Sequence, residues 1–329
     1  MFSNLLHIPV TLVRPLYERS SFHRSVIEEL DDQELREAYS ICRSITRNHA
    51  KTFYMATRFL PNQKQRGIFA IYALCRYIDD MVDEAEDLIR KHELSQDEIS
   101  VHLGKWKSQL QDTYEGYRHD NPILLALADV LKHYHISIDL PFTLMEGVAM
   151  DLVKNRYQSF KELYEYAYKV ASIVGLMTLE IFGYSDSEAP DYAVDLGIAM
   201  QLTNILRDLG EDLSKDRIYL PREDLDQFQV RERDLIAHRM TENFVNLMKY
   251  QICRARHYYS QAEKGIPMLS KDSRLPVGLA LTNYSRILDK IEENSYQVFS
   301  RRAYLSKSEK LMMLPRVLQK TRFSRSAGE

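Results

Sequence analysis

The chain has 329 residues, and its 44 lysines and arginines against 47 aspartates and glutamates give a formal net charge of -3. Hydrophobic residues make up 45% and charged residues 28%, which excludes a mainly disordered chain, and the near-neutral charge argues against a dedicated nucleic-acid binder. Eleven glycines and ten prolines are few for this length and leave little room for the many tight turns of an all-β fold. We therefore expect an all-α protein.

The sequence offers no sign of a disulfide framework or a bilayer span. Cys42, Cys75 and Cys253 are odd in number and far apart, which favours a reducing compartment. The longest apolar stretch, 170–182, is too short to cross a membrane, and residues 1–13 lack the basic region of a signal peptide. These features predict a soluble, cytoplasmic protein.

Helical periodicity runs through the whole chain, and no apolar–polar alternation is long enough to indicate a sheet. Ser95 precedes an acidic first turn, and Asn121 followed by Pro122 is typical of a helix start. No linker rich in glycine, serine or proline divides the chain, so we expect a single all-α domain. The predicted helices span residues 33–47, 50–60, 62–91, 96–118, 121–136, 139–155, 159–184, 188–212, 231–264, 276–304 and 307–323.

The charge is concentrated toward the C-terminal end. Residues 301–329 carry a local balance of +6, so the remainder of the chain carries -9. A solvated terminal helix with a tail is one interpretation. Peripheral contact with an anionic membrane, where each basic residue contributes about 1 kcal/mol, is the other. We divide the chain into an N-terminal extension (1–30), an all-α domain (31–305) and a basic C-terminal helix and tail (306–329).

The segment 67–87 predicts an interior helix that carries one polar stripe. On a helical projection Tyr72, Arg76, Asp79 and Asp83 fall within about 60°, while apolar residues cover most of the remaining circumference. A helix that is apolar nearly all round belongs inside a protein. Its acidic stripe must therefore face another element or an enclosed cavity.

The segment 199–221 repeats this arrangement. Gln201, Asn204, Asp208 and Asp212 share one face of the predicted helix, and apolar residues cover the other directions. Each of the two segments thus contains the pattern DxxxD, which sets two carboxylates one helical turn apart.

Two buried carboxylate pairs need a compensating cation, because each uncompensated buried carboxylate costs several kcal/mol or becomes protonated. Ligands that are all oxygen suit Mg²⁺ or Mn²⁺. Mg²⁺ usually takes one or two protein carboxylates and shares its remaining positions with water and substrate phosphates. Two such pairs facing each other across a cavity would clamp a diphosphate, although their spacing does not identify the substrate.

These two segments, CRYIDDMVD at 75–83 and QLTNILRDLGEDLSKDRIYLP at 201–221, closely resemble the two signatures of the squalene/phytoene synthase family. The resemblance extends over roughly residues 40–305, and phytoene synthases look most similar. Further matching motifs follow in chain order: HAKTFY at 49–54, GVAMDL at 147–152, VASIVG at 170–175 and YSRILDKIEENSYQVFSRR at 284–302.

The resemblance implies an isoprenoid synthase helical fold with a central cavity. It implies that Asp79, Asp83, Asp208 and Asp212 hold Mg²⁺ bridged to diphosphate, assisted by Asn204. The catalytic positions that it implies are Tyr72, Arg76 and Tyr284. The substrate-binding positions that it implies are His49, Lys51, Phe53, Gln201, Arg217, Tyr219 and Arg301.

The implied activity is Mg²⁺-dependent head-to-head condensation of two geranylgeranyl diphosphates to phytoene, through a cyclopropyl diphosphate, in carotenoid biosynthesis. One alternative is a C30 synthase that makes squalene, dehydrosqualene or presqualene diphosphate from farnesyl diphosphate, with NADPH needed only for squalene. A non-catalytic helical scaffold is the second alternative. Thr57 is small and favours the longer substrate, whereas Ser172 and Ile173 replace the family's usual Gly-Thr and would narrow a tunnel that they bordered.

Overall fold

The computed structural model describes residues 26–90 and 96–323. Residues 1–25 of the expected N-terminal extension and 324–329 of the expected tail lie outside the described residues. The described part is all-α, as predicted, and its extended contacts are two isolated β-bridges. The helices of the first half are α3 (Gln33–His49), α4 (Lys51–Thr57), α5 (Asn62–Arg90), α6 (Gln96–Tyr114), α7 (Pro122–Leu131), α8 (Asp139–Ala149) and the 3₁₀ turn η1 (Met150–Leu152).

The second half continues with helices of very different length. They are α9 (Phe160–Ala167), the π-helical turn η2 (Tyr168–Ser172), α10 (Ile173–Phe182), α11 (Ala189–Ser214), α12 (Arg222–Gln227), α13 (Glu232–Ile236), α14 (Glu242–Ala262), the 3₁₀ turn η3 (Glu263–Met268), α15 (Lys271–Glu293), α16 (Lys307–Met312) and α17 (Leu314–Phe323).

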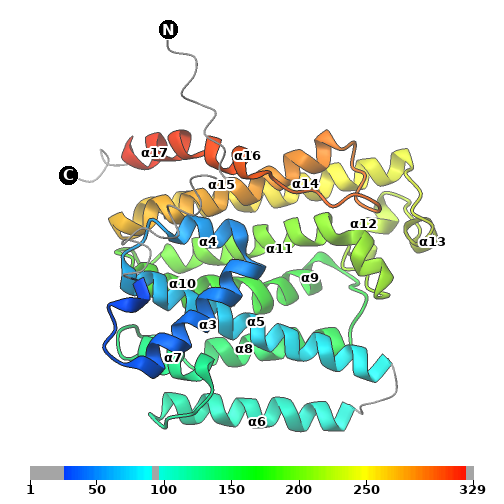
Figure 1. The fold of residues 1–329 in the computed structure, drawn as a ribbon. Helices are drawn as coiled ribbons and strands as arrows, with labels where there is room; N and C mark the ends of the chain where they lie inside the picture. Colours follow the sequence, from blue (N-terminus) through cyan, green and yellow to red (C-terminus); the bar gives the residue numbers. More distant parts are fainter. Residues whose placement is uncertain (1–25, 91–95, 324–329) are drawn as a thin grey trace.

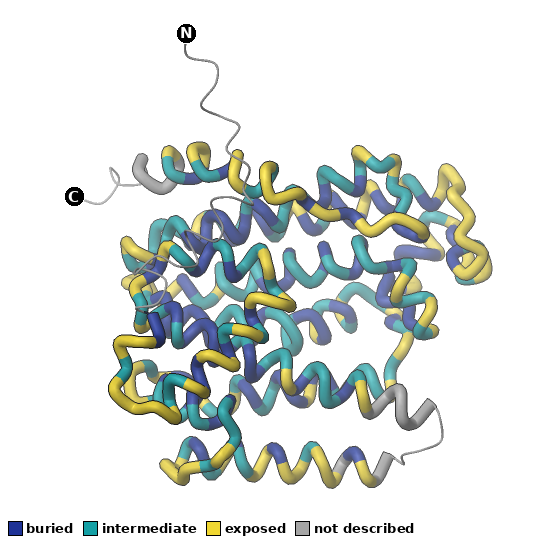
Figure 2. Tube along the Cα trace, in the orientation of Figure 1, coloured by how far each residue is buried: buried dark blue, intermediate teal, exposed yellow. Residues whose placement is uncertain are grey.

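The long helices lie in stacked rows that run in similar directions (Figure 1). Helices α16 and α17 lie along one edge of the molecule, followed by α14 and α15, then by α10 and α11, then by α5 and α8, with α6 at the opposite edge. Helix α5 packs against α3, α7, α8 and α10, whereas α11 packs against α10, α14 and α15. Buried residues line the inward faces of these rows (Figure 2). The two helices that carry the DxxxD patterns are therefore central, as predicted.

A close approach between two backbones fixes the position of α11. A side chain on Gly197 would place its Cβ 2.4 Å from the Cα of Ser172, so only glycine fits there. The Ser172 hydroxyl donates a hydrogen bond of 2.8 Å to the Val194 carbonyl oxygen. This contact occurs where the π-helical turn η2 interrupts the helix predicted over 159–184. Such turns absorb an extra residue and are frequent at functional sites.

The predicted helix 276–304 is wrong at both ends. Helix α15 begins earlier, at Lys271, and accommodates Pro276 in its second turn, whereas it ends at Glu293. Ser295 and Tyr296 adopt left-handed φ angles of 53° and 61°, which stop the helix and release the chain into an extended segment. Of the other predicted helices, 231–264 divides into α13 and α14, 307–323 into α16 and α17, and those over 121–136 and 139–155 end early.

No helix in the described ranges combines the length and the apolar character that crossing a bilayer requires.

Candidate active site

Helix α5 presents the first carboxylate pair as predicted. Ile78 and Val82 are fully buried, whereas Arg76, Asp79 and Asp83 on the polar stripe keep part of their surface accessible. The Arg76 Nη1 atom donates a hydrogen bond of 2.8 Å to Asp79 Oδ2, and its Nη2 atom donates to Asp80. Arg76 is therefore an ion-pair partner of the motif before any substrate is bound.

The two carboxylates of the second pair, Asp208 and Asp212 on α11, have pKa values shifted in opposite directions. Asp208 accepts hydrogen bonds of 2.8 Å from Arg207 Nε and from Arg302 Nε. Burial opposes the ionised form of Asp208, but these two guanidinium groups outweigh it and lower the pKa of Asp208. Burial and the neighbouring Asp208 instead raise the pKa of Asp212 to about 7. Asp212 thus carries negative charge that the protein does not fully compensate.

The two motifs face each other across the interior. Lys215 Nζ, just after the end of α11, lies 4.0 Å from Asp83 Oδ1 on α5. Burial and Asp83 raise the pKa of Asp79 to about 6, although 47% of its side chain is accessible. The negative charge of Asp151 in η1 contributes to the raised pKa values of both Asp79 and Asp212. One acidic centre therefore joins α5, η1 and α11.

Asp151 also belongs to this acidic centre, although it was not among the predicted site residues. Its carboxylate accepts hydrogen bonds of 2.9 Å from the hydroxyls of Tyr166 and Tyr219, whose rings stack with centroids 5.2 Å apart. Burial raises the pKa of Asp151, and the positive charge of Arg217 opposes this shift. The GVAMDL motif at 147–152 contains Asp151, so the signal for it was present in the sequence.

The donor set fits a hard divalent cation. The Asn204 Oδ1 atom is buried and accepts no hydrogen bond, while its amide nitrogen donates to Gln201 Oε1 at 3.3 Å. A buried oxygen without a donor is costly unless a cation occupies its lone pairs. Within the described ranges no three acidic, histidine or cysteine side chains form a complete metal site, but Mg²⁺ normally completes its shell with water and phosphate oxygens.

We expect Asn204→Ala to raise the Mg²⁺ concentration that gives half-maximal activity by about tenfold, because an oxygen ligand is lost. The metal-free protein should unfold at an unchanged or higher temperature, since the variant also removes an unsatisfied buried oxygen. Glu211→Gln is the control, because Glu211 lies on the same helix but is exposed. An equal change in the Mg²⁺ requirement of both variants would contradict the role of Asn204.

An apolar cavity of about 140 Å³ lies between α4, α10, α11, η3 and α15, and none of the carboxylates of the acidic centre lines it. Phe53 lines it and lies beside Tyr72, with ring centroids 6.2 Å apart. Met200, also in its wall, directly precedes Gln201. The central cavity that the resemblance implied is therefore present, and it starts next to the two polar stripes.

The structure corrects one expectation about the walls of this cavity. Ala171, Val174 and Gly175 line it, but Ser172 and Ile173 do not. Ser172 packs against α11, and Ile173 is buried in the hydrophobic core. Ser172 and Ile173 therefore do not border this cavity, which was the condition for them to narrow it.

The tyrosines predicted at the reaction centre lie close together on different helices. Burial and the proximity of Tyr284 on α15 raise the pKa of Tyr72 on α5. Burial opposes the charged form of Arg207, but Asp208 and the neighbouring Tyr284 outweigh this effect and raise the pKa of Arg207. Tyr72 and Tyr284 thus join the first motif, through Arg76, to the second motif, through Arg207.

Three predicted substrate-binding residues, His49, Lys51 and Arg301, lie at the surface. Arg302, not Arg301, reaches Asp208, and the side chain of Arg301 is exposed. His49 and Lys51 are exposed at the junction of α3 and α4. Lys51 lies near Lys310, whose pKa is lowered by burial and by the positive charge of Lys51.

Comparisons with known proteins agree with this geometry. The profile of the family described as squalene/phytoene synthase matches residues 46–309. A 15-cis-phytoene synthase of Synechocystis sp. is 42% identical over 85% of this chain and 84% of its own length. Phytoene synthase 2, chloroplastic, of Solanum lycopersicum is 42% identical over 85% of this chain and 90% of its own length.

Solved structures show the same fold. A dehydrosqualene synthase in complex with a ligand superposes with a TM-score of 0.80 at 30% identity, covering 88% of this chain and 99% of its own. Squalene synthase HpnC from Alicyclobacillus acidocaldarius gives a TM-score of 0.73 at 25% identity, covering 82% of this chain and 98% of its own. With the family profile matched over most of its length, the chain belongs to the squalene/phytoene synthase family.

Proposed function

We propose that this protein joins two molecules of geranylgeranyl diphosphate head to head and converts the product to phytoene. Family membership makes it a prenyltransferase of the phytoene synthase type. The observation that carries the proposal is the layout of α11: residues of its first half, up to Met200, line the apolar cavity, and its second half carries Asp208 and Asp212, with Lys215 reaching Asp83 of the first pair. Such a site binds a charged diphosphate and an apolar chain at the same time.

Asp79, Asp83, Asn204, Asp208 and Asp212 are the residues that would hold Mg²⁺. When bound, Mg²⁺ would neutralise the negative charge that develops on the departing diphosphate. Arg76 would shift from its aspartate partners toward that diphosphate and absorb part of the same charge. In this scheme the C2–C3 alkene of the second substrate attacks the allylic cation, and loss of a proton closes the cyclopropane.

A second ionisation, a rearrangement and a further proton loss would then give the conjugated triene of phytoene. In this scheme the apolar walls of the cavity would keep water away from the carbocation, which water would otherwise quench to an alcohol. The aromatic faces of Phe53, Tyr72 and Tyr284 would stabilise a nearby cation by about 0.5–2 kcal/mol each.

The substrate assignment is tested by incubating the purified protein and Mg²⁺ with geranylgeranyl diphosphate or farnesyl diphosphate. The hydrocarbons are identified by chromatography and mass spectrometry. We expect a C40 hydrocarbon from geranylgeranyl diphosphate without NADPH. Production of C30 hydrocarbon alone would establish the alternative, which the likeness to the dehydrosqualene synthase structure supports. Absence of turnover with either diphosphate would favour a scaffold role.

A membrane contact at the C-terminal helices would let an apolar product leave the protein. Leu311 and Met312 on α16 are exposed, as is Tyr304 before it, next to the basic residues of the same segment. We expect the double substitution Leu311→Asp and Met312→Asp to weaken binding to anionic liposomes by at least about tenfold, because apolar contact and charge attraction act together. The control is Val153→Asp, because Val153 is also an exposed apolar residue but directly follows η1, outside the C-terminal segment. Equal losses in a flotation assay would rule out α16 as the contact.

A further inference from the structure

The end of α11 sets the distance between Asp212 and Arg217. The backbone N–H of Arg217 donates to the Asp212 carbonyl oxygen at 2.9 Å, and that of Asp216 donates to the Leu213 carbonyl oxygen at 3.1 Å. This pair of hydrogen bonds, with Asp216 at a left-handed φ of 57°, is a Schellman helix end. Asp212, the last carboxylate of the second motif, and Arg217 therefore belong to one capping unit.

Asp216 is a costly residue at this position, because glycine adopts a left-handed φ with less strain. Its side chain nevertheless has two partners from a distant part of the chain. Asn155 Nδ2 donates to Asp216 Oδ2 at 3.1 Å, and Arg156 Nη2 donates to Asp216 Oδ1 at 2.8 Å. Arg156 Nη1 also donates to the Asp216 carbonyl oxygen at 2.5 Å. Arg156 thus binds both the side chain and the backbone of the strained residue.

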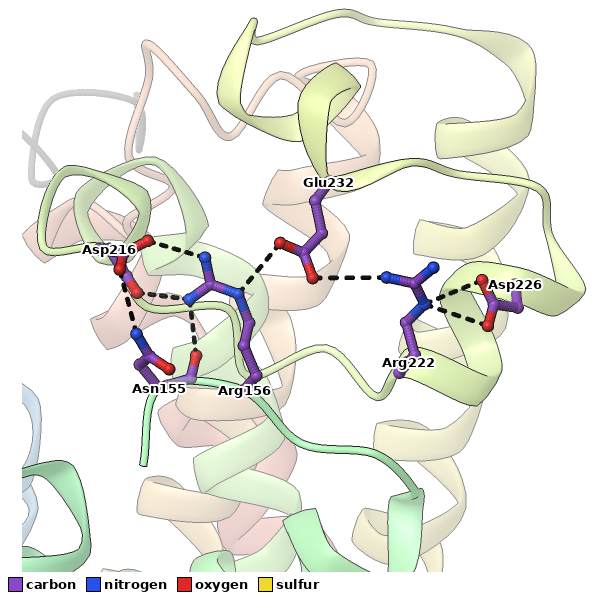
Figure 3. Close-up of polar contacts among 6 residues, drawn as sticks. All are labelled: Asn155, Arg156, Asp216, Arg222, Asp226 and Glu232. Carbon is purple, nitrogen blue, oxygen red and sulfur yellow. Dashed lines mark hydrogen bonds and ion pairs between the residues drawn. The ribbon is translucent and has the colours of Figure 1, made fainter. Parts of the chain in front are cut away.

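Arg156 extends this contact to a third segment. Its Nε atom donates to Glu232 Oε2 at 3.2 Å, and Glu232 also lies 3.6 Å from Arg222 Nη1 (Figure 3). Arg222 pairs with Asp226 on its own helix, and Figure 3 shows it separated from Asp216. The two arginines share Glu232, but only Arg156 reaches the end of α11.

The segment that follows Asp216 is held on two sides. On the outer side it runs beside residues 155–158, where the Ile218 N–H donates to the Asn155 carbonyl oxygen at 3.0 Å and the Arg222 N–H to that of Tyr157 at 2.8 Å. On the inner side the Tyr219 hydroxyl donates to Asp151. Arg217 lies between these attachments and is buried, with 5% of its surface exposed.

We propose that Arg156 is a positioning residue for the condensation: by holding the Asp216 turn, it fixes the buried guanidinium of Arg217 against Asp151 and Asp212. The inference rests on the proposed function, because it assigns Arg156 an effect on the reaction at that site. Arg156 itself touches neither the carboxylate pairs nor the cavity walls. A displacement of about 1 Å at a charged group in a reaction centre reduces rate by about a hundredfold, so a remote anchor of Arg217 has a measurable effect.

Asp216→Gly is the most specific test, because it removes the side chain of residue 216 and leaves its left-handed backbone turn in place. Glycine satisfies the left-handed turn, so the unfolding temperature should be unchanged or higher, but the carboxylate that Arg156 binds is lost. We expect kcat to fall by about tenfold or more in Asp216→Gly and in Arg156→Gln. Arg156→Lys should recover part of this loss, since lysine keeps the charge without the paired donors.

Arg222→Gln is the matched control, because Arg222 shares Glu232 with Arg156 and is half-exposed. Its kcat should stay within twofold of the parent protein. Wild-type kcat in Asp216→Gly, or equal losses in Arg156→Gln and Arg222→Gln, would overturn the proposal. So would a loss of activity in Arg156→Gln that merely follows a fall in unfolding temperature.

The two proposals fail in distinguishable ways. If the parent protein forms no C40 hydrocarbon from geranylgeranyl diphosphate, the proposed substrate is wrong, and the variants are compared on the diphosphate that is consumed. If the parent protein turns over and the variants match it in kcat, the substrate assignment stands and the role of Arg156 is refuted.

Discussion

Replacing Asp79 with asparagine should lower kcat/KM for geranylgeranyl diphosphate by about 10²–10³-fold, because the variant loses a carboxylate that we propose to bind Mg²⁺. The fold should survive. Burial and Asp83 raise the pKa of Asp79 to about 6, so at pH 8 its ionised form is less favourable in the folded protein than in the unfolded chain. Asparagine removes that charge, and the metal-free variant should unfold at an unchanged or higher temperature.

Asp80→Asn is the matched control for this variant. Asp80 is the next residue on α5 and also accepts a hydrogen bond from Arg76, but it is not one of the two carboxylates of the DxxxD pattern. We expect its kcat/KM to stay within tenfold of the parent protein. Steady-state kinetics at saturating Mg²⁺ and thermal unfolding without metal provide the two measurements. Equal losses in the two variants would remove the assignment of Asp79 as a metal ligand.

Thr57→Phe should change the length of the substrate that the protein accepts. Thr57 lies one helical turn after Phe53 on α4, and both side chains line the apolar cavity. A ring at this position would fill space that a C20 chain requires and a C15 chain requires less. We expect kcat/KM for geranylgeranyl diphosphate to fall about a hundredfold, whereas turnover of farnesyl diphosphate should be retained or gained.

Thr57→Val controls for the loss of the hydrogen bond that the Thr57 hydroxyl donates to the Tyr54 carbonyl oxygen, since valine has nearly the same volume. Its preference between the two diphosphates should match that of the parent protein. The measurement is a competition assay with both substrates, followed by mass spectrometry of the hydrocarbons. An unchanged preference in Thr57→Phe would show that the substrate chain does not reach this part of the cavity.

Periodicity predicted which helices carry the site and which of their faces point inward. The stripe on α5 and the polar face of α11 were visible because apolar residues surround them. Periodicity did not predict the end of α15, because the left-handed φ angles of Ser295 and Tyr296 belong to residues that mostly avoid them. That early end creates the extended segment that brings Arg302, rather than Arg301, to Asp208.

The role of Asp151 could not be predicted from helical spacing. It lies in a single 3₁₀ turn, and its partners Tyr166 and Tyr219 come from two other segments. The positions of Ser172 and Ile173 were also hidden, because the π-helical turn η2 rotates the side chains that follow it relative to a regular α-helix. The positions of Asp151, Ser172 and Ile173 depend on packing between distant segments of the chain. The spacing within each carboxylate pair depends only on one helical turn.

The most direct test of the two carboxylate pairs is a crystal structure with Mn²⁺ and an unreactive prenyl diphosphate analogue. Anomalous scattering would locate the ions. The expected result is Mn²⁺ about 2 Å from carboxylate oxygens of both α5 and α11, bridged by the diphosphate, with the apolar chain in the cavity beside Phe53. Ions bound by only one helix, or a diphosphate far from both, would contradict it.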